Sequence, residues 1–157
     1  MYLILHQPNI NHCNFIFCFA FDDGGSAAIW KSSALDDKHV CKDCRFIMGT
    51  ADGGDSSCAG GIILWENSKA LQCSDILFTS NTATYGGAYA TGKNAGSQNS
   101  FLSFCFFNRN TGSCGTDAYF DPFPVDAYQH CFSTSDSDRI GCWNGTDYDS
   151  TDVLWLP

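Results

Sequence analysis

An imperfect repeat of about 30 residues constrains the fold of this chain more than any other feature. It is clearest in the segment Phe78-Thr-Ser-Asn81-Thr-Ala83-Thr-Tyr-Gly86-Gly87-Ala88. The position of Phe78 recurs at intervals of 26 to 32 residues, at Phe15, Phe46, Phe107 and, without the aromatic ring, Ser133. Repeats of this length are typical of stacked architectures, in which each unit buries its apolar face against its neighbours.

Several other columns repeat in the same register. Cysteine stands two residues before the anchor at Cys13, Cys44, Cys105 and Cys131, and the column five residues before it holds Ile10, Cys41, Cys73, Leu102 and Tyr128. Asparagine follows the anchor at Asn81 and Asn110, and glycine pairs follow at Gly24-Gly25, Gly60-Gly61 and Gly86-Gly87. The Cys-x-Phe step has the period of a strand, and no stretch has a convincing helical period. We expect the Asn and Gly columns at corners, because both residues tolerate left-handed backbone angles.

These columns predict an all-β parallel β-helix of about five coils over residues 1–145, anchored near Phe15, Phe46, Phe78, Phe107 and Ser133. Residues 146–157 depart from the pattern and are expected to form an irregular tail or a partial cap. The first repeat begins almost at once and no capping element precedes it, so we expect a fragment of a longer solenoid. The opening residues also lack the pattern of a signal peptide.

The chain has 10 cysteines, and the repeat offers an explanation for most of them. Equivalent positions on stacked strands lie about 4.8 Å apart, which exceeds the usual Cβ separation of a disulfide. We therefore expect a ladder of buried thiols that pack as small apolar groups. Cys58, Cys114 and Cys142 fall in predicted turns and could form a disulfide. Cys41-x-x-Cys44 lacks the second pair that a zinc site needs, so no metal or cofactor is expected.

Phe78-x-x-Asn81 followed by Gly86-Gly87-Ala88-Tyr89 resembles the paired FxxN and GGA[ILV] signatures of the polymorphic outer membrane protein repeat. That repeat defines a family of chlamydial surface proteins, and cysteine-rich versions occur in surface proteins of parasitic protists. Phe107-x-x-Asn110 is a second match, while Gly60-Gly61-Ile62 and Gly24-Gly25 match the glycine half only. The resemblance implies a right-handed parallel β-helix and a place at the cell surface.

Polysaccharide lyases and hydrolases of the pectate lyase and polygalacturonase type share the β-helix fold, so an enzyme is the main alternative. Such chemistry needs clustered carboxylates with a basic group. The candidates are Asp22-Asp23, Asp36-Asp37, Asp75 and Arg139, and they are scattered along the repeats. The column three residues before the anchor could face outward as a strip of side chains suited to a metal: His12, Asp43, Asp75, Phe104 and His130. Its aromatic member and its spread favour a solvated face.

The expected function is therefore non-enzymatic: adhesion or surface display through the outward loops of a β-helix rod, with a structural spacer as a further alternative. A host protein or glycan is the expected partner, and open coil ends could allow end-to-end self-association. A net charge of −9 argues against nucleic acid, and no segment has the roughly 20 apolar residues of a membrane helix. The chain is expected at the cell surface or outside the cell, where Asn144-Gly-Thr146 is a possible glycosylation sequon.

Overall fold

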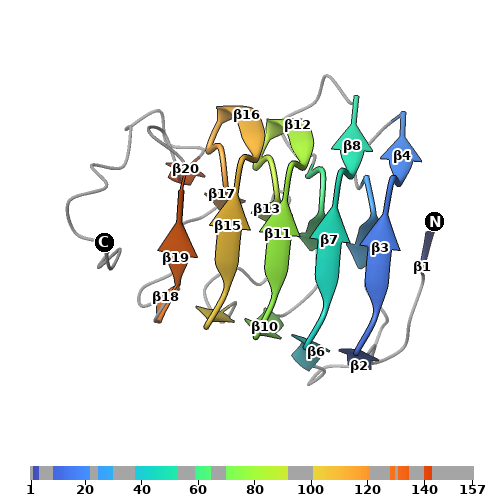
Figure 1. Cartoon of the computed structure of the whole chain (residues 1–157), viewed down its shortest axis with the longest axis vertical. Helices are drawn as coiled ribbons and strands as arrows, with labels where there is room; N and C mark the ends of the chain where they lie inside the picture. Colours follow the sequence, from blue (N-terminus) through green and yellow to red (C-terminus); the bar gives the residue numbers. More distant parts are fainter. Residues whose placement is uncertain are drawn as a thin grey trace.

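The computed structural model describes residues 2–3, 9–21, 25–29, 38–52, 59–64, 70–91, 101–120, 128–129, 131–134 and 140–142. These residues form short strands in four parallel sheets and no helix, which confirms the all-β parallel architecture (Figure 1). Within the described part of the chain, no helix is long and apolar enough to cross a membrane.

The first four repeats each contribute strands to four sheets, which follow one another along the chain in the order B, C, D and A, and the described part of the fifth repeat contributes to B, C and A. Sheet A contains β1 (Tyr2–Leu3), β5 (Ala27–Ile29), β9 (Ile62–Leu64), β13 (Tyr89–Thr91), β17 (Ala118–Phe120) and β20 (Ile140–Cys142). Sheet B contains β2 (Asn9–Asn11), β6 (Lys38–Lys42), β10 (Ala70–Ser74), β14 (Phe101–Ser103) and β18 (Tyr128–Gln129). Sheet C contains β3 (Asn14–Ile16), β7 (Arg45–Ile47), β11 (Leu77–Thr79), β15 (Phe106–Asn108) and β19 (Phe132–Ser133). Sheet D contains β4 (Phe19–Ala20), β8 (Thr50–Ala51), β12 (Thr82–Tyr85) and β16 (Thr111–Cys114).

The strand register follows the repeat columns of the sequence. In sheet C the anchors pair in one continuous row: Phe15, Phe46, Phe78, Phe107 and Ser133. In sheet B the column five residues earlier does the same: Ile10, Cys41, Cys73, Leu102 and Tyr128. Because all pairs are parallel, each residue lies against its counterpart from the next repeat, and side chains at equivalent positions stack.

The core lies between the sheets and is centred on the stacked phenylalanines. Successive rings in this column are nearly parallel, with centroids 4.8, 5.3 and 5.0 Å apart. Phe46, Phe78 and Phe107 are fully buried, and Tyr89 on sheet A packs in the same cluster. Burial of each such ring contributes about 1.5–3 kcal/mol, so a strand of three residues is held mainly by its inward side chain.

The glycine column differs from the prediction by one residue in the second repeat. Backbone hydrogen bonds align Gly60 with Gly87 and Gly61 with Ala88, whereas the repeat columns predict Gly60-Gly61 opposite Gly86-Gly87. Among the described glycines only Gly86 and Gly115 have positive φ. Gly87 serves another purpose, since a Cβ there would collide with the carbonyl oxygen of Thr116. Close approach of successive repeats, and not backbone angle, requires glycine at that position.

Candidate functional site: the outward corners

The first corner of each repeat joins sheets B and C and consists of one left-handed residue that faces solvent. Its members have φ between 50° and 57°: His12, Asp43, Asp75 and Phe104. Their backbone N–H groups continue the hydrogen bonding between successive strands, because His12, Asp43 and Asp75 each donate to a carbonyl of the next repeat at 3.1 Å. These bonds offset the cost, about 1–3 kcal/mol, of holding a residue other than glycine in this conformation. The predicted outward strip therefore exists for these four residues, while His130 lies outside the described residues.

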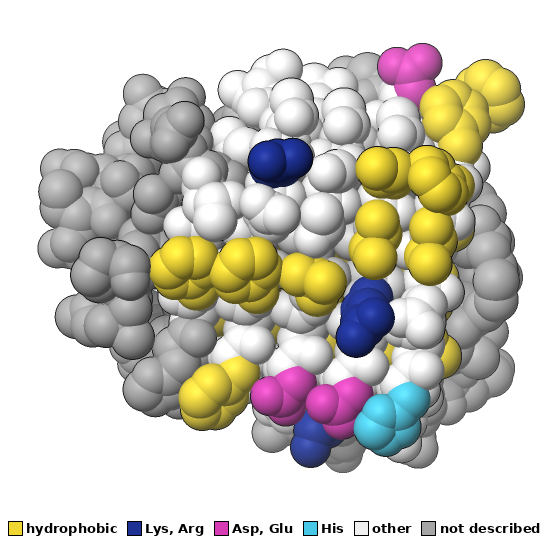
Figure 2. Space-filling model, viewed as in Figure 1, with side chains coloured by type: hydrophobic (Ala, Val, Ile, Leu, Met, Phe, Trp, Pro, Cys, Tyr) yellow, Lys and Arg dark blue, Asp and Glu magenta, His cyan; other side chains and the backbone are white. Residues whose placement is uncertain are grey.

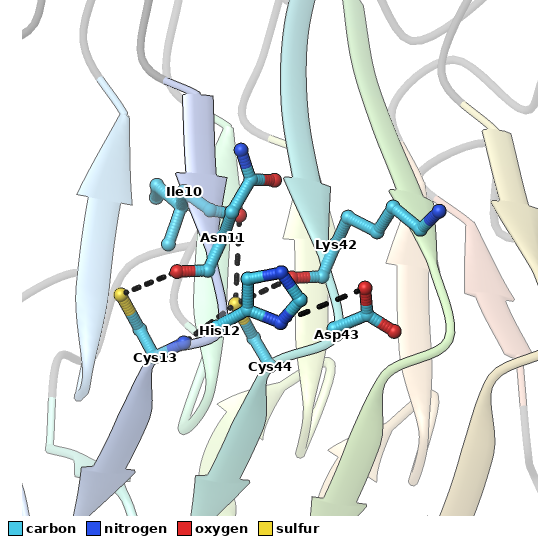
Figure 3. A network of polar contacts seen from close by, with 7 residues as sticks. All are labelled: Ile10, Asn11, His12, Cys13, Lys42, Asp43 and Cys44. Atoms are coloured by element: carbon cyan, nitrogen blue, oxygen red, sulfur yellow. Dashed lines mark hydrogen bonds and ion pairs between the residues drawn. The ribbon is translucent and has the colours of Figure 1, made fainter.

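The one ion pair among the described residues lies on this strip. His12 Nδ1 is 3.7 Å from Asp43 Oδ2, and the two side chains are 78% and 39% exposed (Figure 3). A pair so open to water contributes little to stability. Asp75 and Phe104 continue the strip, and both are exposed. Within the part of the chain that the structure describes, no group of three His, Cys, Asp or Glu side chains could hold a metal ion.

A second corner joins sheets C and D, one residue before the Asn column at which the sequence places it. Its left-handed residues are again outward: Phe17, Met48, Ser80 and Arg109. The sequence predicts the left-handed angle at the Asn column, one residue later, and this prediction is wrong. Asn81 and Asn110 follow the corner and turn their side chains inward, where both are buried. The only sequence signal for this corner is its place directly before Asn81 and Asn110, since the four corner residues share no chemistry.

The asparagines connect successive repeats through their side chains. Asn81 Oδ1 accepts a hydrogen bond from the N–H of Gly49 at 3.0 Å, and Asn81 Nδ2 donates to the carbonyl of Phe46 at 2.9 Å. Asn81 Nδ2 also donates to Asn110 Oδ1 at 3.0 Å. Asn110 Nδ2 in turn donates to the carbonyl of Phe78 at 3.3 Å. The column is therefore a buried asparagine ladder that supports the second corner, as side chains of this kind do elsewhere when backbone groups are left without partners.

Two departures from the repeat meet at the end of this ladder. Ser133 replaces the phenylalanine anchor, and Asp117 occupies the position of Ala88 in the preceding repeat. The Ser133 hydroxyl donates to Asp117 Oδ2, and Asn110 Nδ2 donates to Asp117 Oδ1 at 3.1 Å. All three side chains are buried. A hydrogen-bonded polar cluster therefore takes the place of another aromatic ring, with its buried groups satisfied by one another.

The buried thiols form further interior columns beside the column of phenylalanines. The described free cysteines are Cys13, Cys18, Cys41, Cys44, Cys73, Cys105 and Cys131. Five of them are at most 3% exposed: Cys41, Cys44, Cys73, Cys105 and Cys131. Cys44 Sγ lies 3.1 Å from the carbonyl of Lys42 and receives the N–H of Cys13 at 3.4 Å (Figure 3). Cys58 and the side chains of Cys114 and Cys142 lie outside the described residues.

This environment keeps the buried thiols protonated. A hydrogen bond from Cys44 lowers the pKa of Cys41, but the neighbouring Cys73 thiol and burial outweigh it, and the net shift is upward. The hydrogen bond to Cys41 and burial raise the pKa of Cys44. Burial raises the pKa of Cys73, and burial with the Cys131 thiol raises that of Cys105. Because the thiolate is the reactive form, these cysteines are packing groups in the folded protein.

Of the carboxylates and the arginine considered for an enzyme, the structure describes only Asp75. Asp75 stands on the exposed first corner, and the ion pair on this strip joins His12 and Asp43. The other candidates, Asp22-Asp23, Asp36-Asp37 and Arg139, lie outside the described residues, as do Gly24 and the sequon at Asn144. What the described geometry can do is present side chains in rows, with one outward corner residue from each repeat at a regular spacing.

Comparisons of this chain with protein-family models, with curated proteins and with solved structures found no match.

Proposed function

We propose that the chain is a right-handed parallel β-helix that acts as a non-enzymatic display scaffold at the cell surface or outside the cell, as part of a longer protein. Its outward corners and loops bind a host protein or glycan. The observation that carries this proposal is the contrast between the two sides of each repeat. Inward positions recur as Phe, Cys and Asn, while the same outward backbone position carries unrelated side chains on successive repeats.

This contrast is what a binding scaffold requires. Six of the eight corner residues donate their backbone N–H to a carbonyl of the next repeat, so a corner side chain is free to vary without loss of the fold. The first corner thereby presents His12, Asp43, Asp75 and Phe104 in one row, and the second presents Phe17, Met48, Ser80 and Arg109. Rows of different side chains on a rigid support offer shape and charge recognition without a catalytic centre.

The state of the cysteines is compatible with an extracellular location. Oxidising compartments favour disulfides between accessible thiols. The five most buried thiols are protected from oxidants by the sheets around them. The raised pKa values of Cys41, Cys44, Cys73 and Cys105 reduce the reactive thiolate further. Reduced cysteines inside the scaffold therefore do not conflict with the proposed location.

Binding by the corner rows can be tested with beads coated with the purified protein and incubated with cultured cells and with a glycan array. The matched variant carries His12→Asn, Asp43→Asn and Asp75→Asn, because Asn suits the left-handed conformation and should preserve the fold. Binding by the original protein with loss in this variant supports the proposal. Absence of binding by both proteins, or cleavage of polygalacturonate by the original protein, would refute it.

A further inference from the structure

The second corner and the strands beside it carry an apolar patch that this chain leaves uncovered. The patch consists of five side chains from the first two repeats, each 44–84% exposed: Ile16, Phe17, Phe19, Phe21 and Met48. Figure 2 shows hydrophobic side chains gathered over β3, β4, β7 and β8 at one side of this face. Three of the five are aromatic, and the rings of Phe19 and Phe21 meet edge to face with centroids 4.9 Å apart.

Much of the patch is left without burial in the chain that carries it. Phe17 is 74% exposed and stands at a left-handed corner, a conformation that disfavours a bulky side chain. Met48 occupies the same corner on the next repeat. A large apolar residue there remains 44–74% exposed and adds conformational cost, while Ser80 fills the equivalent position with a small polar group. Such residues gain their stabilisation only when a partner covers them.

The size of the patch fits a protein partner. At about 200 Å² for each phenylalanine, the exposed fractions of Phe17, Phe19 and Phe21 correspond to roughly 400 Å² of aromatic surface. Ile16 and Met48 enlarge it further. The largest patch on a typical monomer is about 300–600 Å², and a stable complex buries about 800 Å² on each partner. The three phenylalanine rings therefore supply about half of one side of an interface, and Ile16, Met48 and the polar rim would supply the rest.

The charges at the rim point to a second copy of this chain. Along the second repeat, exposed Arg45 precedes the patch on β7 and exposed Asp52 follows it after β8. Figure 2 shows a basic side chain bordering the hydrophobic area on one side and an acidic one on the opposite side. A twofold axis that lies in the contact plane along the stacking direction of the repeats reverses the strand direction of one copy relative to the other. Arg45 of each copy then faces Asp52 of its partner, so one contact produces two opposite-charge pairs.

We propose that this patch binds the same patch on a second copy of the chain, in an antiparallel twofold dimer with Arg45 opposite Asp52. The dimer joins two rods side by side, which differs from association through their open ends. It also leaves the first corner of each copy available, so that two rows of display residues belong to one particle. The inference does not depend on the proposed ligand-binding function.

The test measures self-association by sedimentation velocity over a wide range of protein concentration. The original chain should form a dimer, and Phe17→Asn with Met48→Asn should weaken dimerisation at least about tenfold. Asn is favoured at left-handed positions, so this variant keeps the fold. The matched control is Phe104→Asn, which has the same backbone conformation and a 60% exposed ring but lies outside the patch. The control should dimerise like the original chain.

Charge exchange tests the twofold geometry without removing any apolar group. Arg45→Asp alone and Asp52→Arg alone should each weaken the dimer, because each places like charges opposite one another. An equimolar mixture of the two single variants should recover dimers. In the mixed dimer the exchanged side chain at position 45 of one variant, an acid, faces the exchanged side chain at position 52 of the other, a base. The second pair is the original Arg45 opposite Asp52, so both contacts again join opposite charges. The proposal is overturned if the original chain stays monomeric at every concentration or forms open-ended oligomers. It is also overturned if Phe104→Asn weakens association equally, or if the double variant carrying both exchanges fails to recover the dimer.

Discussion

Replacement of Asn81 tests the asparagine ladder most directly, because the side chain is fully buried and makes three hydrogen bonds. Asn81→Ala removes the acceptor of the Gly49 N–H and the donor to the Phe46 carbonyl. It also removes one of two donors to Asn110 Oδ1, which keeps its bond from the Asn81 backbone N–H at 3.0 Å. The change therefore leaves one buried donor without its partner and weakens two acceptors.

The magnitude follows from these three groups. A buried donor left without a partner costs about 1–3 kcal/mol, and each other lost bond costs about 0.5–1.5 kcal/mol. We expect Asn81→Ala to lower the free energy of unfolding by about 2–6 kcal/mol, a large part of the stability of a small protein. For a urea m-value of about 2 kcal/mol/M, the unfolding midpoint should fall by about 1–3 M.

The assay is urea denaturation followed by circular dichroism, with hydrogen exchange of the Gly49 amide as a local probe. The matched control is Thr82→Ala, because Thr82 is the exposed neighbour of Asn81 in sequence and should change stability by less than about 0.5 kcal/mol. The Gly49 amide should exchange faster in Asn81→Ala than in the control. The reasoning fails if both variants lose the same stability, or if Gly49 remains equally protected in both.

Four further predictions concern the thiols, the polar cluster and the corners. Above the ordinary thiol pKa of 9.0, unfolded cysteines release protons that the folded chain retains, so stability is full below pH 9 and falls as the pH rises further. Urea midpoints that are equal at about pH 8 and about pH 10 would contradict the raised pKa values of Cys41, Cys44, Cys73 and Cys105. Asp117→Ala should cost about 2–4 kcal/mol, and a double-mutant cycle with Ser133→Ala should show coupling of about 1 kcal/mol or more; additive effects would exclude the polar cluster. Gly87→Ala should cost more than about 1 kcal/mol in thermal or urea unfolding, and a neutral outcome would argue against the close approach of Thr116. Arg109→Asn should raise stability by up to about 1 kcal/mol by relieving a left-handed arginine; a decrease would mean that the Arg109 side chain itself stabilises the fold.

The strand register can be predicted from the sequence because parallel stacking repeats it. When each strand lies against its counterpart one repeat away, a residue type that suits an inward position suits it again in the next repeat. The columns of Phe78 and Cys73 therefore form a pattern in the sequence alone, and the strands pair in that register. The asparagine ladder follows from the same regularity, since Asn81 and Asn110 occupy one column.

The corners are not predictable in the same way. Left-handed geometry at Phe17 or Met48 is imposed by the hydrogen bonds of neighbouring repeats, and it overrides the preference of the residue itself. Residue preference points instead to Asn and to the glycine pairs, which misplaces one corner and shifts Gly60 by one position. A corner needs only a backbone donor and an outward side chain, so it leaves no common chemistry for a sequence comparison to find.

The sequence by itself determined the repeat, the inward columns and the direction in which strands stack, because these depend on side chains that recur at each repeat. Only the tertiary structure decided which residues face outward at the second corner, and that Asp117 meets Ser133 across 16 residues. It also decided that apolar side chains from two repeats form one exposed patch. These features depend on residues that differ from their counterparts in the other repeats, so periodicity carries no information about them.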